Sequence, residues 1–553
     1  MNQKKLQIWL PTLLSLTLAL GMFFGYKLKD HMGTYGRSFW GSHKKNNYQE
    51  ILELIQTKYV DTVNVDSLSY SAIQNVLELL DPHSVYIPAD QLQNANEDLQ
   101  GKFEGIGIEF ALIDDTVNVL NLVPNGPAQK AGLQVGDQIL KSNDSIVSGI
   151  GADEERIQKL FRGTKGSDLT ITYRRKDVTR QINLKRGLIP LNSVVAAYFL
   201  EPGTAYIKLI KFSSNTYEEF MEHLERLKNE GMTNLILDLR GNGGGMLDDA
   251  IQIADEFLEG NRDIVYTEGK AAPKQYHTAR RPGLFEKGKL TLLIDEGSAS
   301  ASEVLAGALQ DWDRATIIGR RSYGKGLVQE QFSLSDGSAL RLTVSRYFTP
   351  IGRSIQKPYQ KGLLNDYKHE IENRVSNGEV YQGDSTHHHG KAYKTKSGRI
   401  LYGGGGIEPD VFIPMDSSRF QTQQEQQVKN AIKQAAYLYF IKKKDQIAAF
   451  TTAEQLRTYL RKDPLLRQIL NERFQKESLQ VASFSTRQME LIQFQLEAML
   501  AHHRWPGDGF YKMMETADPY IKRALILIHE NKGAMMQITD NPFCILKKDY
   551  RII

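Results

Sequence analysis

Between residues 189 and 415 the chain alternates short apolar segments with amphipathic ones, and this alternation limits the possible folds more than any other feature. The stretch NLILDLRGN has the pattern of a buried strand that enters a turn, and KLTLLIDEGSASASEVLAGALQD that of a strand, a turn and a helix. Strands that alternate with helices predict a largely parallel sheet, with functional groups at the carboxyl ends of its strands. We therefore expect a multidomain α/β protein whose site lies in these turns.

Residues 99–188 have a different pattern, in which short β-type runs are separated by glycine turns. A glycine turn that leads into an edge strand can bind a peptide as an additional strand, and the amides of the turn can hold its C-terminal carboxylate. The segment, which begins with FEGIGIEF, resembles a PDZ domain, and a generic small β-domain is the alternative. The resemblance makes Gly105, Ile106, Gly107 and Ile108 the carboxylate-binding loop.

The N-terminal segment contains an uncharged stretch of 21 residues, from position 6 to 26, which follows Lys4 and Lys5. A helix of that length spans the hydrocarbon core of a bilayer, which is about 30 Å thick. No A-x-A cleavage site follows, which favours an uncleaved signal anchor over a removed signal peptide. Basic residues follow the stretch as well as precede it, so the charges do not decide its orientation. We expect residues 1–30 to be a membrane anchor.

Two further regions have helical patterns. Residues 38–98 contain two helical stretches that end at DPHSVYIP, where Pro82 and Pro88 stop the helices. Residues 416–553 are charged and helical, and they contain no recognisable chemistry. The net charge of +4 over 553 residues gives no reason to expect nucleic acid as a partner. The single cysteine, Cys544, excludes an internal disulfide framework and a cysteine-rich metal site.

The turn DLRGNGGGML carries glycines at positions 241, 243, 244 and 245, which allow a close approach of the backbone to a substrate. A phosphate-binding loop would need the spacing G-x-x-x-x-G-K-[ST], and the lysine and hydroxyl are missing. A chymotrypsin-like GDSGG would need serine at position 243. The remaining interpretations are an oxyanion hole, in which amides bind a negatively charged oxygen, or a simple tight turn.

Three serines, Ser298, Ser300 and Ser302, alternate directly before an apolar helix. Ser300 and Glu303 fit the S-x-x-E capping box, so a purely structural cap is one interpretation. A nucleophile is the other, and it would need a base. The histidines His223 and His277 do not lie in strand-end turns, and a solvated loop explains HHH at 387–389 better than a metal site.

Lys325 is a second candidate for the base, because it lies between two glycines at the end of a strand in SYGKGLVQEQF. Burial disfavours the ammonium form, so a buried lysine can accept a proton near neutral pH. Gln329 follows four residues later and could orient the lysine by a hydrogen bond. An exposed turn is the alternative for this motif.

Taken together, DLRGNGGG, GSASASEVLAGALQD and ATIIGRRSYGKGLVQ, after a PDZ-like segment, resemble the carboxyl-terminal processing peptidases of serine peptidase family S41. The resemblance covers residues 48–410. It implies a crotonase/Clp-like α/β core, no metal and no organic cofactor. Gly243 departs from the family, since many relatives carry Pro or Ser there. The implied roles are Ser300 as nucleophile, Lys325 as general base, Gln329 as its orienter, and the amides of Ala301 and of Gly244 or Gly245 as the oxyanion hole.

The resemblance implies a serine endopeptidase whose PDZ domain binds accessible apolar C-terminal tails of protein substrates. It also implies a bacterial inner-membrane protein with most of the chain in the periplasm or outside the cell. Two alternatives remain open: a catalytically silent scaffold that gathers tails, and a latent protease whose PDZ domain blocks the site until a tail or an activating partner docks. The partners considered besides substrate are such an activating partner and a homo-oligomer. The expected regions are an anchor (1–30), a helical segment (38–98), a PDZ domain (99–188), a peptidase core (189–415) and a C-terminal helical domain (416–553).

Overall fold

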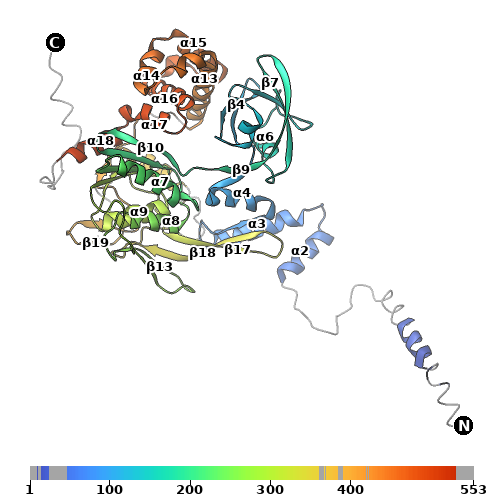
Figure 1. Cartoon of the computed structure of the whole chain (residues 1–553). Helices are drawn as coiled ribbons and strands as arrows, with labels where there is room; N and C mark the ends of the chain where they lie inside the picture. Colours follow the sequence, from blue (N-terminus) through green and yellow to red (C-terminus); the bar gives the residue numbers. More distant parts are fainter. Residues whose placement is uncertain are drawn as a thin grey trace, which may run out of the picture. The chain divides into compact units, whose positions relative to one another are not determined.

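A computed structural model describes residues 47–359, 369–383, 390–418 and 422–530, together with 9, 11, 14–23, 367 and 420. The chain divides into two compact units, Met1–Ile73 and Gln74–Ile553 (Figure 1). The described part of the first unit includes α2 (Asn47–Lys58) and the beginning of α3 (Val65–Glu78). None of the helices described is long and apolar enough to cross a membrane. Most of the expected anchor, the HHH sequence and Cys544 fall outside the described residues.

In the second unit, the PDZ-like region forms an antiparallel sheet with the strand order β3-β4-β5-β7-β8. The turns after β3, β5 and β7 contain no glycine and instead use Asp, Asn and Lys residues with positive φ. The apolar residues of the strands face a common core with the helices α5 (Pro127–Ala131) and α6 (Glu154–Phe161). Two strands that pair with each other, β2 (Lys102–Gly105) and β9 (Gly187–Pro190), lead into and out of this region. The sheet contains β3 (Ile108–Ile113), β4 (Thr116–Leu122), β5 (Gln138–Ser142), β7 (Asp168–Arg175) and β8 (Val178–Lys185), and β6 (Ser145–Ile146) pairs with β5.

The core of the second unit is a six-stranded sheet with the order β10-β11-β12-β15-β16-β21. The strands from β11 to β21 are parallel, and β10 pairs antiparallel with β11 at one edge. The expected largely parallel sheet is thus confirmed. Its strands are β10 (Val194–Glu201), β11 (Thr204–Leu209), β12 (Asn234–Asp238), β15 (Lys289–Ile294), β16 (Thr316–Gly319) and β21 (Val411–Phe412).

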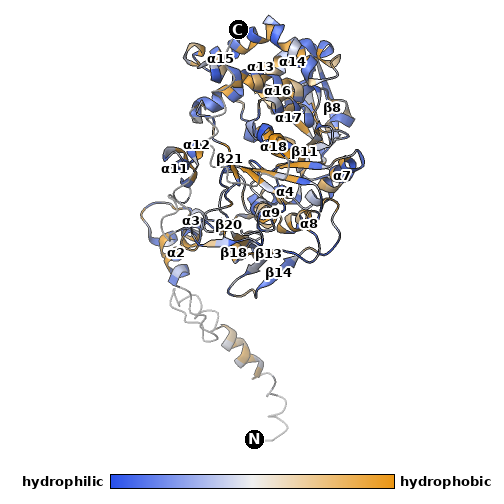
Figure 2. Ribbon diagram, turned by 90° about the vertical axis from the view of Figure 1, so that its left-hand side faces the viewer, coloured by the Kyte–Doolittle hydropathy of each residue, from blue (hydrophilic) through white to orange (hydrophobic). Residues whose placement is uncertain are grey.

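Helices cover both faces of this sheet, because alternate residues of each parallel strand point to opposite sides. Leu235 and Leu237 of β12 pack on the face that carries α7 (Thr216–Asn229), α8 (Leu247–Asp255) and α9 (Ala301–Asp311). Ile236, between them, packs on the other face against α18 (Pro519–His529). Figure 2 shows α18 as one of the most hydrophobic helices of the chain.

A second sheet lies in the same unit. It contains the strand that follows residues 320–326, the loop with Lys325, which we call the lysine loop. β18 (Ala339–Phe348) pairs with β17 (Leu327–Ser333) on one edge, and with β1 (Val85–Ile87) and β13 (Asp263–Glu268) as well. β13 also pairs with β14 (Gln275–Thr278). The short strands β19 (Ala392–Lys394) and β20 (Ile400–Tyr402) form a separate pair, and α4 (Ala89–Gln100), α11 (Glu370–Ser376) and α12 (Glu379–Gln382) complete this part.

The C-terminal region is helical, as expected, and most of it has a hydrophobic core of its own. Its last described helix differs, because α18 joins the core of the parallel sheet and not that of the other helices. The packing therefore crosses position 416, because this helix shares a hydrophobic core with strands that precede that position. The other helices are α13 (Thr422–Ala448), α14 (Ala453–Lys462), α15 (Pro464–Lys476), α16 (Thr486–Arg504) and α17 (Asp508–Met514), with 3-10 turns at Val481–Ser483 and Glu515–Ala517.

Candidate active site

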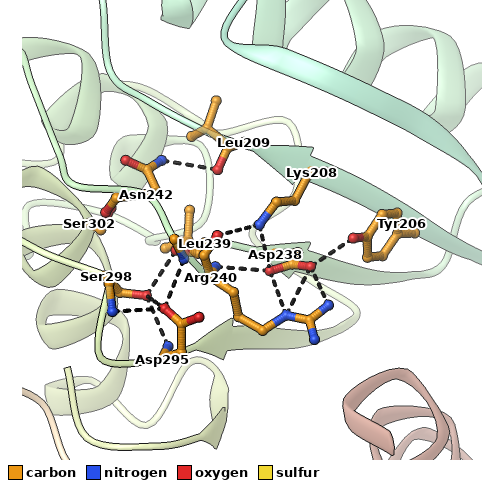
Figure 3. Close-up of polar contacts among 12 residues, drawn as sticks. Tyr206, Lys208, Leu209, Asp238, Leu239, Arg240, Asn242, Asp295, Ser298 and Ser302 are labelled. Carbon is orange, nitrogen blue, oxygen red and sulfur yellow. Dashed lines mark hydrogen bonds and ion pairs between the residues drawn. The ribbon is translucent and has the colours of Figure 1, made fainter. Parts of the chain in front are cut away.

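The serine turn connects β15 to α9, and Ser300 is its last residue. The φ angle of Ser300 is +54°, a left-handed value that is uncommon for a residue with a side chain and that marks a sharp turn. Ser298 and Ser302 are fully buried, and their hydroxyls donate to the carbonyl oxygens of Leu239 and Asn242, both at 2.8 Å (Figure 3). Ser300 is only half-buried. Of the three serines, it alone has a side chain that a substrate could reach.

Glu303 connects the serine turn with the lysine loop. Its carboxylate is fully buried and accepts hydrogen bonds from the main-chain N–H groups of Ser300 (2.8 Å), Lys325 (2.9 Å) and Gly324 (2.7 Å). The hydroxyl of Ser322 also donates to it, at 2.5 Å. Burial raises the pKa of Glu303, and these hydrogen bonds oppose the rise. The predicted capping box is present, but Glu303 also joins two turns, which the local pattern did not indicate.

Lys325 lies in the loop between β16 and β17. Burial lowers its pKa, and the charge of Arg341 lowers it further, whereas Glu303 and Asp81 act in the opposite direction. A lysine with a lowered pKa has a larger neutral fraction near pH 7, which is the form that accepts a proton. Ser300 Oγ and Lys325 Nζ are not hydrogen-bonded to each other in the described structure.

Tyr347 of β18 contacts both the serine turn and the lysine loop. Its hydroxyl contacts the main-chain carbonyl oxygens of Ser300, at 3.1 Å, and of Lys325. The side chain is almost completely buried, and burial raises the pKa of its hydroxyl well above the ordinary value, so the group remains a donor. Tyr347 and Glu303 therefore hold the main chains of Ser300 and Lys325 from two sides.

Gln329, the expected orienter, lies in β17 and does not contact Lys325. Its Nε2 donates to Thr343 Oγ1 at 3.3 Å, and that hydroxyl donates to Asp81 Oδ1 at 3.0 Å. Asp81 also accepts from the N–H groups of His83 and Ser84. The chain of contacts thus leads from β17 to the segment that precedes β1.

That segment, DPHS, belongs to the site, although its sequence predicted only the end of a helix. The His83 Nε2 atom lies 2.8 Å from the hydroxyl of Tyr367. Burial and the charges of Lys325 and Lys357 lower the pKa of His83 to about 4, so its ring is neutral at pH 7. The signal in the sequence was a group of polar side chains in a proline-bounded turn, since such turns often carry functional residues.

The glycine turn follows β12 and passes directly beside the serine. A Cβ atom at Gly244 would lie 2.8 Å from Ser300 Cβ and 2.9 Å from the Ala301 nitrogen, so only glycine fits. The N–H of Gly244 donates to Asn242 Oδ1 at 2.9 Å. The N–H groups of Ala301 and Gly245 have no acceptor among the described residues.

A buried network of charged groups supports the first residues of this turn. The Asp238 carboxylate, at the end of β12, binds Lys208 Nζ at 3.1 Å, the Tyr206 hydroxyl at 2.7 Å and the Arg240 guanidinium at 2.6 Å (Figure 3). Arg240 and Lys208 keep the pKa of Asp238 well below its usual range. The N–H of Gly241 donates to Asp295 Oδ1 at 2.8 Å, which ties the glycine turn to the serine turn.

In the PDZ-like region, Gly105 is the last residue of β2 and Ile108 the first of β3, and Ile106 and Gly107 connect the two strands. The carbonyl oxygens of Ile106 and Gly107 accept from Ala128 and Val123, and Gly107 has a φ of +74°. β3 pairs with β4 on one side and is the edge strand of the described sheet. α6 lies beside it, since the rings of Phe110 and Phe161 are 5.5 Å apart. The loop therefore precedes an unpaired strand edge.

A half-buried serine at a sharp strand-to-helix turn, main-chain amides without an acceptor and a lysine with a lowered pKa are features that a serine hydrolase would use. The pattern of peptidase family S41 matches residues 203–369, and that of the PDZ domain matches residues 105–185. The "Carboxy-terminal-processing protease" of Bartonella bacilliformis is 35% identical over 333 residues, which are 58% of this chain and 76% of that protein. A "Probable CtpA-like serine protease" of Staphylococcus epidermidis is 32% identical over 338 residues, or 60% and 67%.

Among solved structures, the photosystem II D1 C-terminal processing protease is 27% identical, with coverage of 68% of this chain and 88% of that one and a TM-score of 0.34. The chain belongs to the carboxy-terminal-processing proteases of peptidase family S41. It is a serine peptidase with a PDZ domain, which confirms the resemblance seen in the sequence.

Proposed function

We propose that this protein is an endopeptidase that binds C-terminal tails of proteins with its PDZ domain and cleaves them with a Ser300–Lys325 dyad. The observation that supports the dyad best is the hydrogen bonding of Glu303, which holds the main chains of both residues. Ser298 and Ser302 are buried and engaged with main-chain carbonyls, so they are poor alternatives as nucleophile. Lys325 can serve as the base for Ser300, because its lowered pKa increases the neutral fraction that accepts a proton.

In the proposed reaction, Ser300 Oγ attacks the carbonyl carbon of the scissile bond and its proton passes to the neutral Lys325 Nζ. The peptide C–N bond then breaks, and Lys325 gives that proton to the leaving amine. Water attacks the resulting ester, again with Lys325 as the proton acceptor. When the ester C–O bond breaks, Lys325 returns the proton to Ser300 Oγ. In resting serine and lysine pairs the hydrogen bond is often absent until substrate binds, so a side-chain rotation of Lys325 precedes the first step.

The oxyanion is assigned to the N–H groups of Ala301 and Gly245. Both lack an acceptor among the described residues, whereas the N–H of Gly244 is occupied by Asn242. Each such donor contributes roughly 3 kcal/mol to the stabilisation of the transition state. Gln329 donates to Thr343 Oγ1 in a long hydrogen bond of 3.3 Å. It would orient Lys325 once its side chain leaves Thr343 and binds the ammonium group of Lys325.

The PDZ domain would bind the tail as a strand added to β3, with the carboxylate at the loop from Gly105 to Ile108. The uncharged stretch at 6–26 supports attachment to a membrane, and we propose that the protease faces the periplasm or the cell exterior. Accessibility of residues near position 100 to protease added outside spheroplasts tests that orientation.

The main test uses the full chain in detergent with an unstructured protein that ends in an apolar tail, and mass spectrometry of the products. Wild type should cut, Ser300→Ala and Lys325→Ala should not, and Ser298→Ala and Ser302→Ala should retain cleavage if they fold. Cleavage by Ser300→Ala contradicts the assignment of the nucleophile.

A latent protease is the second candidate, and the absence of a hydrogen bond between Ser300 Oγ and Lys325 Nζ is compatible with both candidates. In that case the wild type binds the tail but cuts only after a partner or a tail peptide in trans stabilises the competent state. A titration with a free tail peptide separates the two candidates: activation supports the latent form, and plain competition supports constitutive activity.

A further inference from the structure

The N-terminus of α18 contacts the residue that leads into the glycine turn. The Asp518 carboxylate receives Arg240 Nη1 at 3.2 Å and Nη2 at 2.7 Å. It also caps its own helix, because Asp518 Oδ1 accepts from the N–H of Tyr520 at 2.9 Å. Arg240 directly precedes Gly241, the first residue of the turn. The C-terminal helix is therefore bonded to the start of the predicted oxyanion hole.

Arg240 is held from both directions. Its guanidinium binds Asp238 on the sheet and Asp518 on α18, and its main-chain N–H donates to Asp238 Oδ1 at 2.9 Å. The ring of Tyr520 lies 4.4 Å from the guanidinium. Figure 3 shows the sheet side of this arrangement, with the Arg240 guanidinium folded back onto the Asp238 carboxylate. Charge-assisted bonds of this kind are short and directional, so they restrict the course of the chain at Arg240.

The same helix contacts the other two turns. The hydroxyl of Tyr520 accepts from Arg320, the first residue after β16, where the lysine loop begins. Arg320 in turn binds Glu296 of the serine turn, at 2.8 and 3.1 Å. The first turn of α18 thus reaches the glycine turn through Arg240, and the serine turn and the lysine loop through Arg320.

Apolar packing fixes the helix to the strands that end in these turns. The side chains involved alternate with those on the α7–α9 face, and they come from β12, β15 and β16. From α18 they are Tyr520, Ile521, Ala524 and Ile528, and from the sheet Ile236, Leu293 and Ile318. The helix therefore spans the three strands on the face opposite to α7–α9.

We propose that Asp518 and Tyr520 are positioning residues for peptide hydrolysis, which set the relative placement of the glycine turn, the serine turn and the lysine loop. They lie outside the segment that matches peptidase family S41, residues 203–369. The inference rests on the proposed function, because that function places the oxyanion donors on two of these turns. Displacement of a donor by about 1 Å in such a site lowers the rate by roughly a hundredfold.

Asp518→Asn in the full chain is the closing experiment. Asparagine also caps helices well, so the helix remains, but the ion pair with Arg240 is lost. Asp463→Asn is the matched control, since Asp463 also caps a helix before a proline and accepts from the N–H of Leu465 at 2.9 Å. Asp463 has no contact with the three turns. A fluorophosphonate probe counts reactive serines, so that kcat is obtained per titrated site.

We expect Asp518→Asn to lower kcat per titrated site by about tenfold, with KM and Tm close to those of wild type and of Asp463→Asn. A purely structural role would lower Tm or the number of titrated sites and leave kcat per site unchanged, and that result overturns the inference.

Tyr520→Phe is the second variant if Asp518→Asn does not fold, and it should lower kcat per site by severalfold through the lost contact with Arg320. If wild type neither cuts nor reacts with the probe, the proposed function fails and the inference fails with it. If wild type cuts and both variants equal it per site, only the inference fails.

Discussion

The main-chain N–H groups of Ser300 and Lys325 donate to the same atom, Glu303 Oε2, at 2.8 and 2.9 Å. The two residues belong to different turns, and one buried carboxylate fixes the separation of their backbones. The other oxygen, Oε1, accepts from Ser322 and Gly324 of the lysine loop. The carboxylate is thus fully used by four donors from the two segments that the proposed chemistry requires.

Glu303→Gln should destabilise the protein and reduce cleavage. Glutamine keeps one acceptor oxygen but replaces the other with an NH₂ group, which leaves two buried donors facing a donor. Each unsatisfied buried group costs about 1–3 kcal/mol. Thermal unfolding and cleavage of a tailed substrate measure the effect, with the exposed Glu155→Gln as control. An unchanged Tm for Glu303→Gln would show that the hydrogen bonds of Glu303 with the two turns contribute little to the stability of the protein.

The rate of cleavage should rise with pH as Lys325 loses its proton, with an apparent pKa below 10.5. The charge of Arg341 lowers the pKa of Lys325, so Arg341→Gln should shift the rising limb of kcat/KM to higher pH. Arg346→Gln on the same strand is the control and should leave the limb in place. A limb that does not move in Arg341→Gln contradicts the role of Lys325 as the base.

The same lowered pKa has a consequence for stability. Between the pKa of folded Lys325 and that of the unfolded chain, the unfolded state binds more protons than the native state. The free energy of unfolding that Lys325 contributes should therefore increase with pH in this window. Lys325→Met removes the buried cation, so it should be inactive and more stable than wild type at pH 7, as measured by urea unfolding at several pH values. A Lys325→Met protein that is less stable at pH 7 would argue against a lysine that is costly to charge.

Substitution within the glycine turn should depend sharply on position. At Gly244, φ is +93° and a Cβ atom would lie 2.6 Å from the Ala299 carbonyl oxygen and 2.8 Å from Ser300 Cβ. Gly244→Ala should therefore lower Tm and abolish reaction with a fluorophosphonate. Gly243→Ala is the matched control, since a Cβ atom there meets nothing within 4 Å. Equal behaviour of the two variants would contradict the close approach of this turn to the serine.

Recognition of a tail by the PDZ domain should depend on its free carboxylate. Amidation of an apolar tail peptide removes the charge that the loop from Gly105 to Ile108 would bind, so its Kd should rise by tenfold or more. Fluorescence anisotropy with the full chain measures both peptides. Gly107→Ala should weaken binding too, because its φ is +74° and a Cβ atom would lie 2.9 Å from Ile189. Equal affinity for the acid and the amide contradicts carboxylate capture.

The strand-end turns could be predicted from the sequence because they depend on local patterns. An apolar strand, a turn with small residues and an amphipathic helix follow each other within about twenty residues, and this order is visible without the fold. Ser300 and Lys325 were proposed in this way and remain a prediction, and the structure connects the segments that carry them through Glu303. The parallel sheet, the PDZ-like region and the C-terminal helices were predicted for the same reason.

Contacts between distant segments could not be predicted in this way. Asp81 reaches the site because β1 pairs with β18, where Val85 lies opposite Arg341, and no periodicity indicates that pairing. The Asn242 side chain takes up the amide of Gly244, a contact that no local pattern indicates and on which our proposal of Gly245 rests. Asp518 had the pattern of an ordinary cap before a proline, and only the packing of α18 places it beside Arg240.

The position of α18 also bears on when the enzyme becomes competent during its own synthesis. Domains generally fold in order as the chain leaves the ribosome. The strands that lead into the turns of Ser300 and Lys325 are made long before residues 518–529, which complete the packing on one face of their sheet. A nascent chain therefore contains Ser300, the proposed nucleophile, for some time before the helix that packs beneath these turns exists. If the proposed site is correct, it would reach its final geometry only after nearly all of the described chain has been translated.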